Sequence, residues 1–189
     1  MIQVGLAAPR RALGLTGMVL GAAVLRALLL PLGDLPSTLV FGGCLMAIAW
    51  THGGMSGWEE QWGRGRALVA GVVVGAVLLA PLVAGPFSAR GLSGFWTWAA
   101  LAALIATLEE IAIRGALFRA WSDEAGPIVA IVAGAAVFAL IHLPRYGWGP
   151  MPLDAAVGIA LGGLRALTGR VLPCAVAHTI ADWGAWFWA

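Results

Sequence analysis

Charged side chains are scarce in this sequence of 189 residues: only 11% are Asp, Glu, Lys or Arg, and lysine does not occur at all. Soluble domains carry about 25% charged and about 45–50% apolar residues. Here 61% of the residues are hydrophobic and the mean hydropathy is +0.91, so a soluble fold of this length could not bury its apolar surface. The composition therefore predicts a membrane protein, and its bias toward Arg, Ala and Gly is typical of a GC-rich bacterial genome.

Cysteine and clustered basic residues are also nearly absent. The two cysteines, Cys44 and Cys174, lie in separate apolar runs and form no CxxC pair, which argues against a disulfide framework and a cysteine zinc site. The net charge of +2 is spread thinly over the connectors and makes no basic stripe for a phosphate backbone. We therefore expect a lipid bilayer as the surroundings and no nucleic-acid partner.

Long hydrophobic runs dominate the chain. A membrane-spanning helix needs about 20 mostly apolar residues. Seven segments come close to that length: Ala12 to Leu32, Leu35 to Trp50, Ala67 to Phe87, Phe95 to Trp121, Pro127 to Leu143, Pro152 to Thr168 and Val171 to Trp188. Short turn-rich connectors separate them, without a long linker or an internal repeat. The pattern predicts an all-α, polytopic transmembrane bundle of about seven helices, forming one domain over residues 1–189.

The arginines indicate an orientation, because short loops rich in arginine stay on the cytoplasmic side. With the N-terminus inside, seven arginines fall at inner edges: Arg10, Arg11, Arg64, Arg66, Arg119, Arg165 and Arg170. Only Arg90 and Arg145 fall outside. The run after Arg11 reaches Leu32 without a clear cleavage site, so we interpret it as a retained helix and not a signal peptide. We expect a multi-pass protein of the cytoplasmic (inner) membrane with a cytoplasmic N-terminus.

Three ionisable residues interrupt the fourth apolar segment. Charged side chains at the centre of a membrane helix cost roughly 2.5–3.5 kcal/mol each on insertion scales, so they persist mainly where they have a function. Glu110 and Arg114 are four residues apart with the acid first, which favours an ion pair on one helix face. Glu109 points about 100° away from that face on a regular helix and has no local partner. An unpaired carboxyl in a dry site is a candidate general base or acid.

Two further pairs of residues share this spacing and a similar depth. Phe138 and His142 lie on the fifth segment, and His178 and Asp182 on the seventh. The fourth and fifth segments should form an antiparallel hairpin, in which Glu109 lies roughly 20 Å and His142 roughly 24 Å from the turn. Asp182 and His178 lie roughly 18 Å and 12 Å deep from the same edge. We therefore predict a polar cavity lined by these two histidines and two acids.

The order of these motifs resembles a known family. Residues 109–114 read EExxxR, residues 138–142 read FxxxH and residues 178–182 read HxxxD, and residues 158–173 contain a Gly-rich helix and a Thr-Gly-x-x-x-Pro turn. This resembles the CPBP family, the CAAX prenyl proteases and bacteriocin-processing enzymes, also called the Abi family. The resemblance covers Phe95 to Asp182, so the motif-bearing core is residues 95–189. The first three segments show nothing diagnostic.

The resemblance implies an intramembrane endopeptidase and a role for each motif. Glu109 and His142 would activate a water, while His178 and Asp182 would stabilise the oxyanion of a tetrahedral intermediate. Glu110 and Arg114 would position their helix, and Phe138 would pack beneath His142. One departure concerns Asp182, since prenyl-protein proteases usually have Asn there. Substrates in the family are prenylated tails, leader peptides or C-terminal sorting anchors, and the last two fit a small bacterial chain best.

The same residues leave alternatives open. Glu109, His142, His178 and Asp182 would also suit zinc, which takes imidazole nitrogen and carboxylate oxygen. We favour no metal or other cofactor, because the zinc helix pattern HExxH is absent. Two functions of other classes also stay open. One is a proton- or ion-coupled transporter whose carboxylates carry the ion, although no repeat supports it. The other is a non-catalytic immunity protein. For a protease, the partner would be a membrane protein or peptide substrate.

Overall fold

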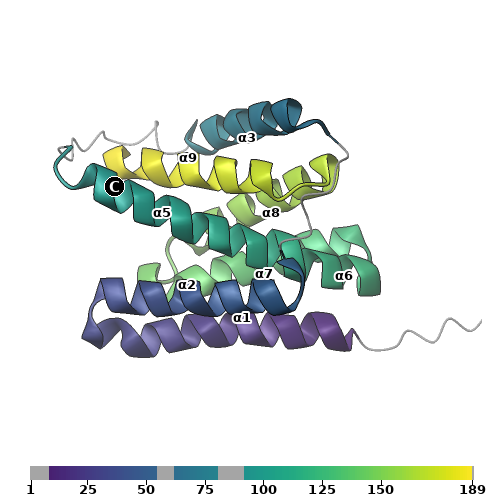
Figure 1. The fold of residues 1–189 in the computed structure, drawn as a ribbon, viewed down its shortest axis with the longest axis horizontal. Coiled ribbons are helices and arrows are strands. Elements are labelled where there is room, and N and C mark those ends of the chain that lie inside the picture. Colours follow the sequence, from purple (N-terminus) through teal and green to yellow (C-terminus); the bar gives the residue numbers. More distant parts are fainter. Residues whose placement is uncertain (1–8, 55–61, 81–91, 189) are drawn as a thin grey trace, which may run out of the picture.

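The computed structural model describes residues 9–54, 62–80 and 92–188, and the helices of Figure 1 occupy nearly all of them. The elements, in chain order, are α1 (Arg10–Leu29) with the short η1 (Leu30–Leu32), α2 (Asp34–Thr51), α3 (Arg64–Leu78), α5 (Phe95–Glu110), η3 (Ile111–Leu117), α6 (Phe118–Ala125), α7 (Pro127–Tyr146), α8 (Met151–Thr168) and α9 (Leu172–Trp188). No strand occurs among these described residues. The predicted all-α bundle is confirmed.

The helices begin and end close to the predicted boundaries. Because η3 continues α5 directly into α6, these three elements form the predicted fourth segment, extended to Ala125. Gly126 and Gly169 follow α6 and α8 with φ of 89° and 69°, a left-handed conformation that glycine adopts without steric cost. The end of the predicted third segment, beyond residue 80, lies outside the described residues.

Three of the described helices are long and apolar enough to cross a membrane, judged by length and composition: Arg10–Leu32, Asp34–Thr51 and Pro127–Tyr146. Their exposed side chains are largely aliphatic, as at Val24, Leu39 and Val132. Such apolar outer faces are suited to lipid, because hydrocarbon chains are as apolar as these side chains. The chain is a membrane protein, while its orientation stays a prediction.

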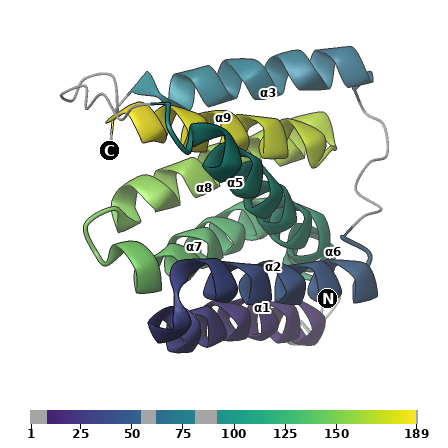
Figure 2. The same ribbon diagram turned by 60° about the vertical axis from the view of Figure 1, so that its left-hand side comes forward.

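The bundle is arranged around α5. Figure 2 shows α1 beside α2 on one face and α3 beside α9 on the opposite face, with α5, α7 and α8 between these two pairs. The larger apolar core joins α1 and α2 to the middle layer through buried side chains such as Leu15, Phe41, Leu45, Ile113 and Phe138. A smaller core joins α8 and α9 and includes Leu161 and Cys174. Helices from the middle layer and α9 can therefore meet in the interior.

Glycines allow two of these helix pairs to approach closely. A Cβ atom on Gly71 would lie 2.7 Å from the carbonyl oxygen of Pro173 on α9. A Cβ atom on Gly158 would lie 2.7 Å from Cα of Ala135 on α7. Membrane helices associate largely through van der Waals packing, which favours small residues at such contacts. These glycines thus set the separation of α3 from α9 and of α8 from α7.

We expect Gly158→Ala to lower the stability of the bundle, because its methyl group would overlap backbone atoms of α7. Overpacking of this kind typically costs about 1–3 kcal/mol. Gly163→Ala on the same helix is the matched control, since nothing lies within 4 Å of a Cβ there. Thermal unfolding of both variants in detergent should show a lower Tm for Gly158→Ala alone. Equal Tm values for the two variants would contradict the packing assignment.

Candidate active site

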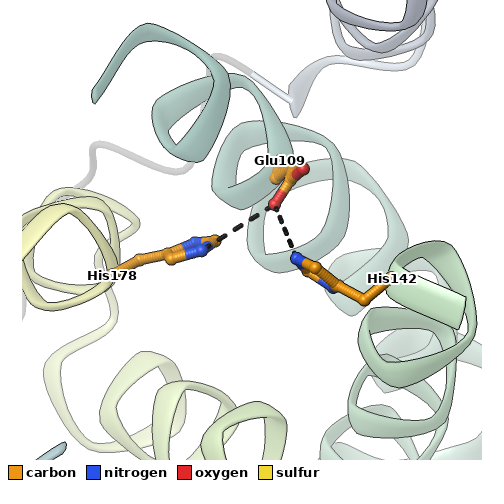
Figure 3. Close-up of side chains that lie close together, drawn as sticks. All are labelled: Glu109, His142 and His178. Carbon is orange, nitrogen blue, oxygen red and sulfur yellow. Dashed lines mark ion pairs between the residues drawn. The ribbon is translucent and has the colours of Figure 1, made fainter. Parts of the chain in front are cut away.

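Three ionisable side chains from three helices converge in the interior (Figure 3). Oε2 of Glu109, on α5, lies 4.0 Å from Nε2 of His142 on α7 and 3.9 Å from Nε2 of His178 on α9. Oδ1 of Asp182 lies 3.6 Å from Nε2 of His178, one helical turn along α9. The structure therefore brings together all four residues that the motif spacing selected.

The four side chains line one cavity of about 540 Å³. Glu109 and His178 are 3% and 4% exposed, whereas the side chain of Asp182 is 37% exposed. The carboxyl of Glu109 is thus withdrawn from the surroundings, and Asp182 lies nearer the open side. A small molecule or an extended peptide segment that entered this space would meet acid and imidazole groups together.

Glu110 connects the EExxxR motif with the HxxxD motif. Its Oε1 accepts a hydrogen bond of 3.1 Å from Nη1 of Arg114, which is the predicted i, i+4 ion pair. The same oxygen lies 3.0 Å from Nδ1 of His178. Arg114 in turn donates to the carbonyl oxygen of Gly158 on α8, at 3.2 Å. Glu110 therefore holds α9 as well as its own helix, a contact that the sequence pattern did not indicate.

The helix changes its winding directly after the two glutamates. Residues Ile111–Leu117 form a π-helix, so the regular 3.6-residue geometry assumed from the sequence ends at Glu110. π-Helical turns are uncommon and frequently occur at functional sites. Gly115 lies here against Gly54, where a Cβ atom would be 2.5 Å from the carbonyl oxygen. Only glycine fits this approach of the π-helix to the end of α2.

Hydrogen bonds orient both imidazole rings. Nδ1 of His142 lies 2.7 Å from the carbonyl oxygen of Phe138, which can only accept, so Nδ1 carries a proton. Glu110 likewise accepts from Nδ1 of His178 because its carboxylate is paired with Arg114. Each Nε2 therefore faces Glu109. The ring of Phe138 packs against both imidazoles, with centroids 4.6 Å and 5.1 Å away.

The arrangement of donors fits a zinc ion. One ligand atom each from Glu109, His142 and His178 lies within 4.8 Å of the others. Ligands around tetrahedral zinc are about 3.3 Å apart, so small rotations would close the set and leave the fourth position open, as in catalytic zinc sites. A carbonyl or carboxylate partner on the second ring nitrogen is also usual for zinc-bound histidine. Asp182 lies outside this three-residue group, although the sequence analysis had included it among the zinc ligands.

Several residues that line the cavity were not predicted from the sequence. Arg26 of α1 and Asp154 of α8 both reach it, and Tyr146 stacks on His142 with ring centroids 5.8 Å apart. None of these three residues belongs to a recognisable motif. Tyr146 follows His142 by four residues, so the helical period alone could have placed these two rings on one face. Arg26 is a charge inside the apolar segment Ala12 to Leu32, which could have singled it out, but its place in this cavity depends on how α1 packs.

We expect Glu110→Gln to destabilise the folded protein strongly, because the buried charge of Arg114, which is 1% exposed, would lose its counter-ion. Removing one partner of a buried ion pair costs about 3–5 kcal/mol. Glu109→Gln is the matched control, because Glu109 is also buried and no arginine of the described residues lies within ion-pair distance of its carboxylate. Unfolding in detergent should give a much lower midpoint for Glu110→Gln than for Glu109→Gln. A similar midpoint for both would show that the ion pair contributes little.

Comparison with known proteins supports the resemblance on independent grounds. The sequence model of the type II CAAX prenyl endopeptidase Rce1-like family matches residues 91–184. No curated protein and no solved structure matches the chain significantly. The matched region contains the four cavity residues and all three motifs. Residues 91–184 of this membrane protein therefore form a domain of the Rce1-like CAAX endopeptidase type within the CPBP family, a family of intramembrane proteases.

Proposed function

We propose that this protein is a glutamate-dependent intramembrane endopeptidase in which Glu109 and His142 activate the attacking water. The observation that carries the proposal is the 4.0 Å separation between Oε2 of Glu109 and Nε2 of His142. This separation is too long for a direct hydrogen bond. It suits one bridging water, because a water with two hydrogen bonds of about 2.8 Å spans roughly 4–5 Å.

The protonation of His142 supports this role for the water. Since Nδ1 donates to the Phe138 carbonyl, Nε2 of the neutral ring is an acceptor, as is the Glu109 carboxylate. A water between two acceptors donates both hydrogens and turns a lone pair outward. That lone pair attacks the carbonyl carbon of the peptide bond while Glu109 takes one proton. Glu109 then passes the proton to the departing amine, so that the carbon–nitrogen bond breaks and an acid and an amine result.

His178 and Asp182 are the proposed donors to the oxyanion. When doubly protonated, His178 keeps its Nδ1–H on Glu110 and presents a second N–H at Nε2. Three carboxylates lie within 4 Å of this ring, from Glu109, Glu110 and Asp182, and favour that charge. Asp182 can donate only while its carboxyl is protonated. Donors placed where negative charge develops lower the barrier most in a buried site, and His178 is buried.

Zinc is the alternative to this metal-free chemistry. Glu109, His142 and His178 would hold the ion, which would supply a Lewis acid for the substrate carbonyl. We favour the metal-free mechanism because the zinc helix pattern HExxH is absent from the chain. As substrates we propose leader peptides or C-terminal sorting anchors of bacterial proteins, because these classes fit a small chain of bacterial composition best.

We expect Glu109→Gln to abolish peptide cleavage while the protein stays folded, because the amide keeps the shape of the side chain but cannot take the proton. General-base catalysis contributes typically about 100- to 10,000-fold in rate. Single-turnover cleavage of a membrane-protein or peptide substrate, compared with the unfolding midpoint of the same preparation, measures both effects. Turnover within about tenfold of the unmodified protein would exclude Glu109 as the water-activating base.

Asp182→Asn separates the metal-free mechanism from the zinc alternative. As an oxyanion donor, Asp182 must be protonated, so activity should fall as rising pH ionises its carboxyl. The amide of the variant donates without titrating, and the variant should therefore stay active and lose this alkaline decline. The measurement is a pH–activity profile of both forms, each with and without a chelator. Activity that a chelator removes from the unmodified protein or from the Asp182→Asn variant would refute the metal-free mechanism.

A further inference from the structure

A guanidinium group reaches the catalytic cavity from outside the family domain. Arg26 lies in the last turn of α1, and it lines the same cavity as Glu109 and His142. The family match begins at residue 91, so the match assigns nothing to α1. The sequence analysis likewise found nothing diagnostic in the first three segments. Arg26 therefore reaches the site from a helix that lies outside the matched region.

Uncharged groups hold Arg26 in place. Its Nη2 donates to the hydroxyl of Thr38 at 3.2 Å, and its guanidinium carbon lies 5.0 Å from the ring centroid of Phe41. Both of these residues are buried on α2, at 6% and 0% exposed. Nε of Arg26 is buried and has no hydrogen-bond partner in the described part of the chain. The side chain is thus fixed, yet its hydrogen-bonding capacity is only partly used.

The second arginine in this cavity provides the contrast. Arg145, on α7, donates through both terminal nitrogens to the two carboxylate oxygens of Asp34 at the start of α2. Its charge is neutralised by a bidentate pair, the geometry that suits guanidinium best. Arg26 forms no ion pair with any described carboxylate. Of the two arginines that line the cavity, only Arg145 forms an ion pair with a described carboxylate.

We propose that Arg26 is a specificity residue that binds a carboxylate of the peptide substrate. A cation that lines a cavity inside a membrane protein is costly unless an anion pairs with it, and Arg forms its strongest hydrogen bonds with carboxylates. The carboxylate belongs either to the C-terminus of the peptide or to a Glu or Asp side chain. This proposal rests on the proposed peptidase function, because the peptide must lie across Glu109 at the same time.

The size of the cavity limits where the carboxylate lies along the peptide. A sphere of about 540 Å³ is on the order of 10 Å across, which an extended chain covers in about three residues. Arg26 and Glu109 line the same space, so the carboxylate lies within a few residues of the bond that is cleaved. A longer separation would put the anion outside the cavity, where lipid or water would surround it.

The test uses the full chain in nanodiscs and four matched libraries of apolar decapeptides. The first two libraries differ only at the C-terminus, which is a free carboxylate in one and an amide in the other. The last two are both amidated and differ in one side chain, which is Glu at each position in turn in the third library and Gln at the same positions in the fourth. Binding is measured by competition with a fluorescent member, and cleavage is measured by mass spectrometry. The proteins are the unmodified chain, Arg26→Gln, Arg26→Lys and Arg10→Gln, where the control Arg10 is exposed at the far end of the same helix.

We expect the unmodified chain to favour one carboxylate-bearing library over its neutral counterpart by about 10- to 100-fold, the range for a lost charged hydrogen bond. Preference for the free acid over the amide identifies the C-terminus, and preference for Glu over Gln identifies a side chain. Arg26→Gln should remove the preference while neutral peptides bind as before. Arg26→Lys should keep part of it, and Arg10→Gln should keep it whole.

Two outcomes overturn the proposal. The first is equal binding and cleavage of acidic and neutral peptides by the unmodified chain. The second is a uniform loss across all four libraries in Arg26→Gln, which would indicate that Arg26 only supports the packing of α1 on α2. Failure of the peptidase function has a different signature, because carboxylate preference in the binding assay without cleavage of any library would refute the enzyme and retain the carboxylate site.

Discussion

The carboxylate of Glu110 is the contact on which the site depends. One of its oxygens accepts from both Arg114 and His178, and Arg114 also donates to the backbone of α8. This network ties α5 and η3 to α8 and α9 in a region where Glu110 is fully buried. Buried charges of this kind are tolerated only when they are paired and hydrogen-bonded. The need to satisfy them fixes the relative position of three helices.

The reactive groups follow from that framework. Nδ1 of His178 is hydrogen-bonded to Glu110, and Nδ1 of His142 is hydrogen-bonded to the Phe138 carbonyl. Both Nε2 atoms therefore point to Glu109. Phe138 fills the space between the two imidazoles and also lies 4.8 Å from the guanidinium carbon of Arg114. Glu109 itself makes no ion pair with arginine in the described residues, and its carboxylate faces the two histidines instead. Adjacent acids on one helix thus have different surroundings, an arginine pair for Glu110 and the cavity for Glu109.

The helices around the site divide into those that carry the motif residues and those that surround them. α5, α7 and α9 supply the acids and histidines, whereas α1 and α2 close one side of the cavity with Arg26, Asp34 and Thr38. Close packing of α3 on α9 through glycines supports the helix that carries His178. The cavity is thus lined by helices of the matched region and by two helices outside it.

The sequence by itself determined the helical bundle and the identity of the four cavity residues. Apolar runs fix the helices because their length and composition are local properties, and charges inside such runs are too costly to be incidental. Only the tertiary structure decided the rest: the second bond from Glu110 to His178, the π-helix after Glu110, and the presence of Arg26 and Tyr146 in the cavity. The bond from Glu110 to His178 and the place of Arg26 depend on how helices distant in sequence pack, whereas spacing along each segment indicates only which residues lie on one face or at a similar depth.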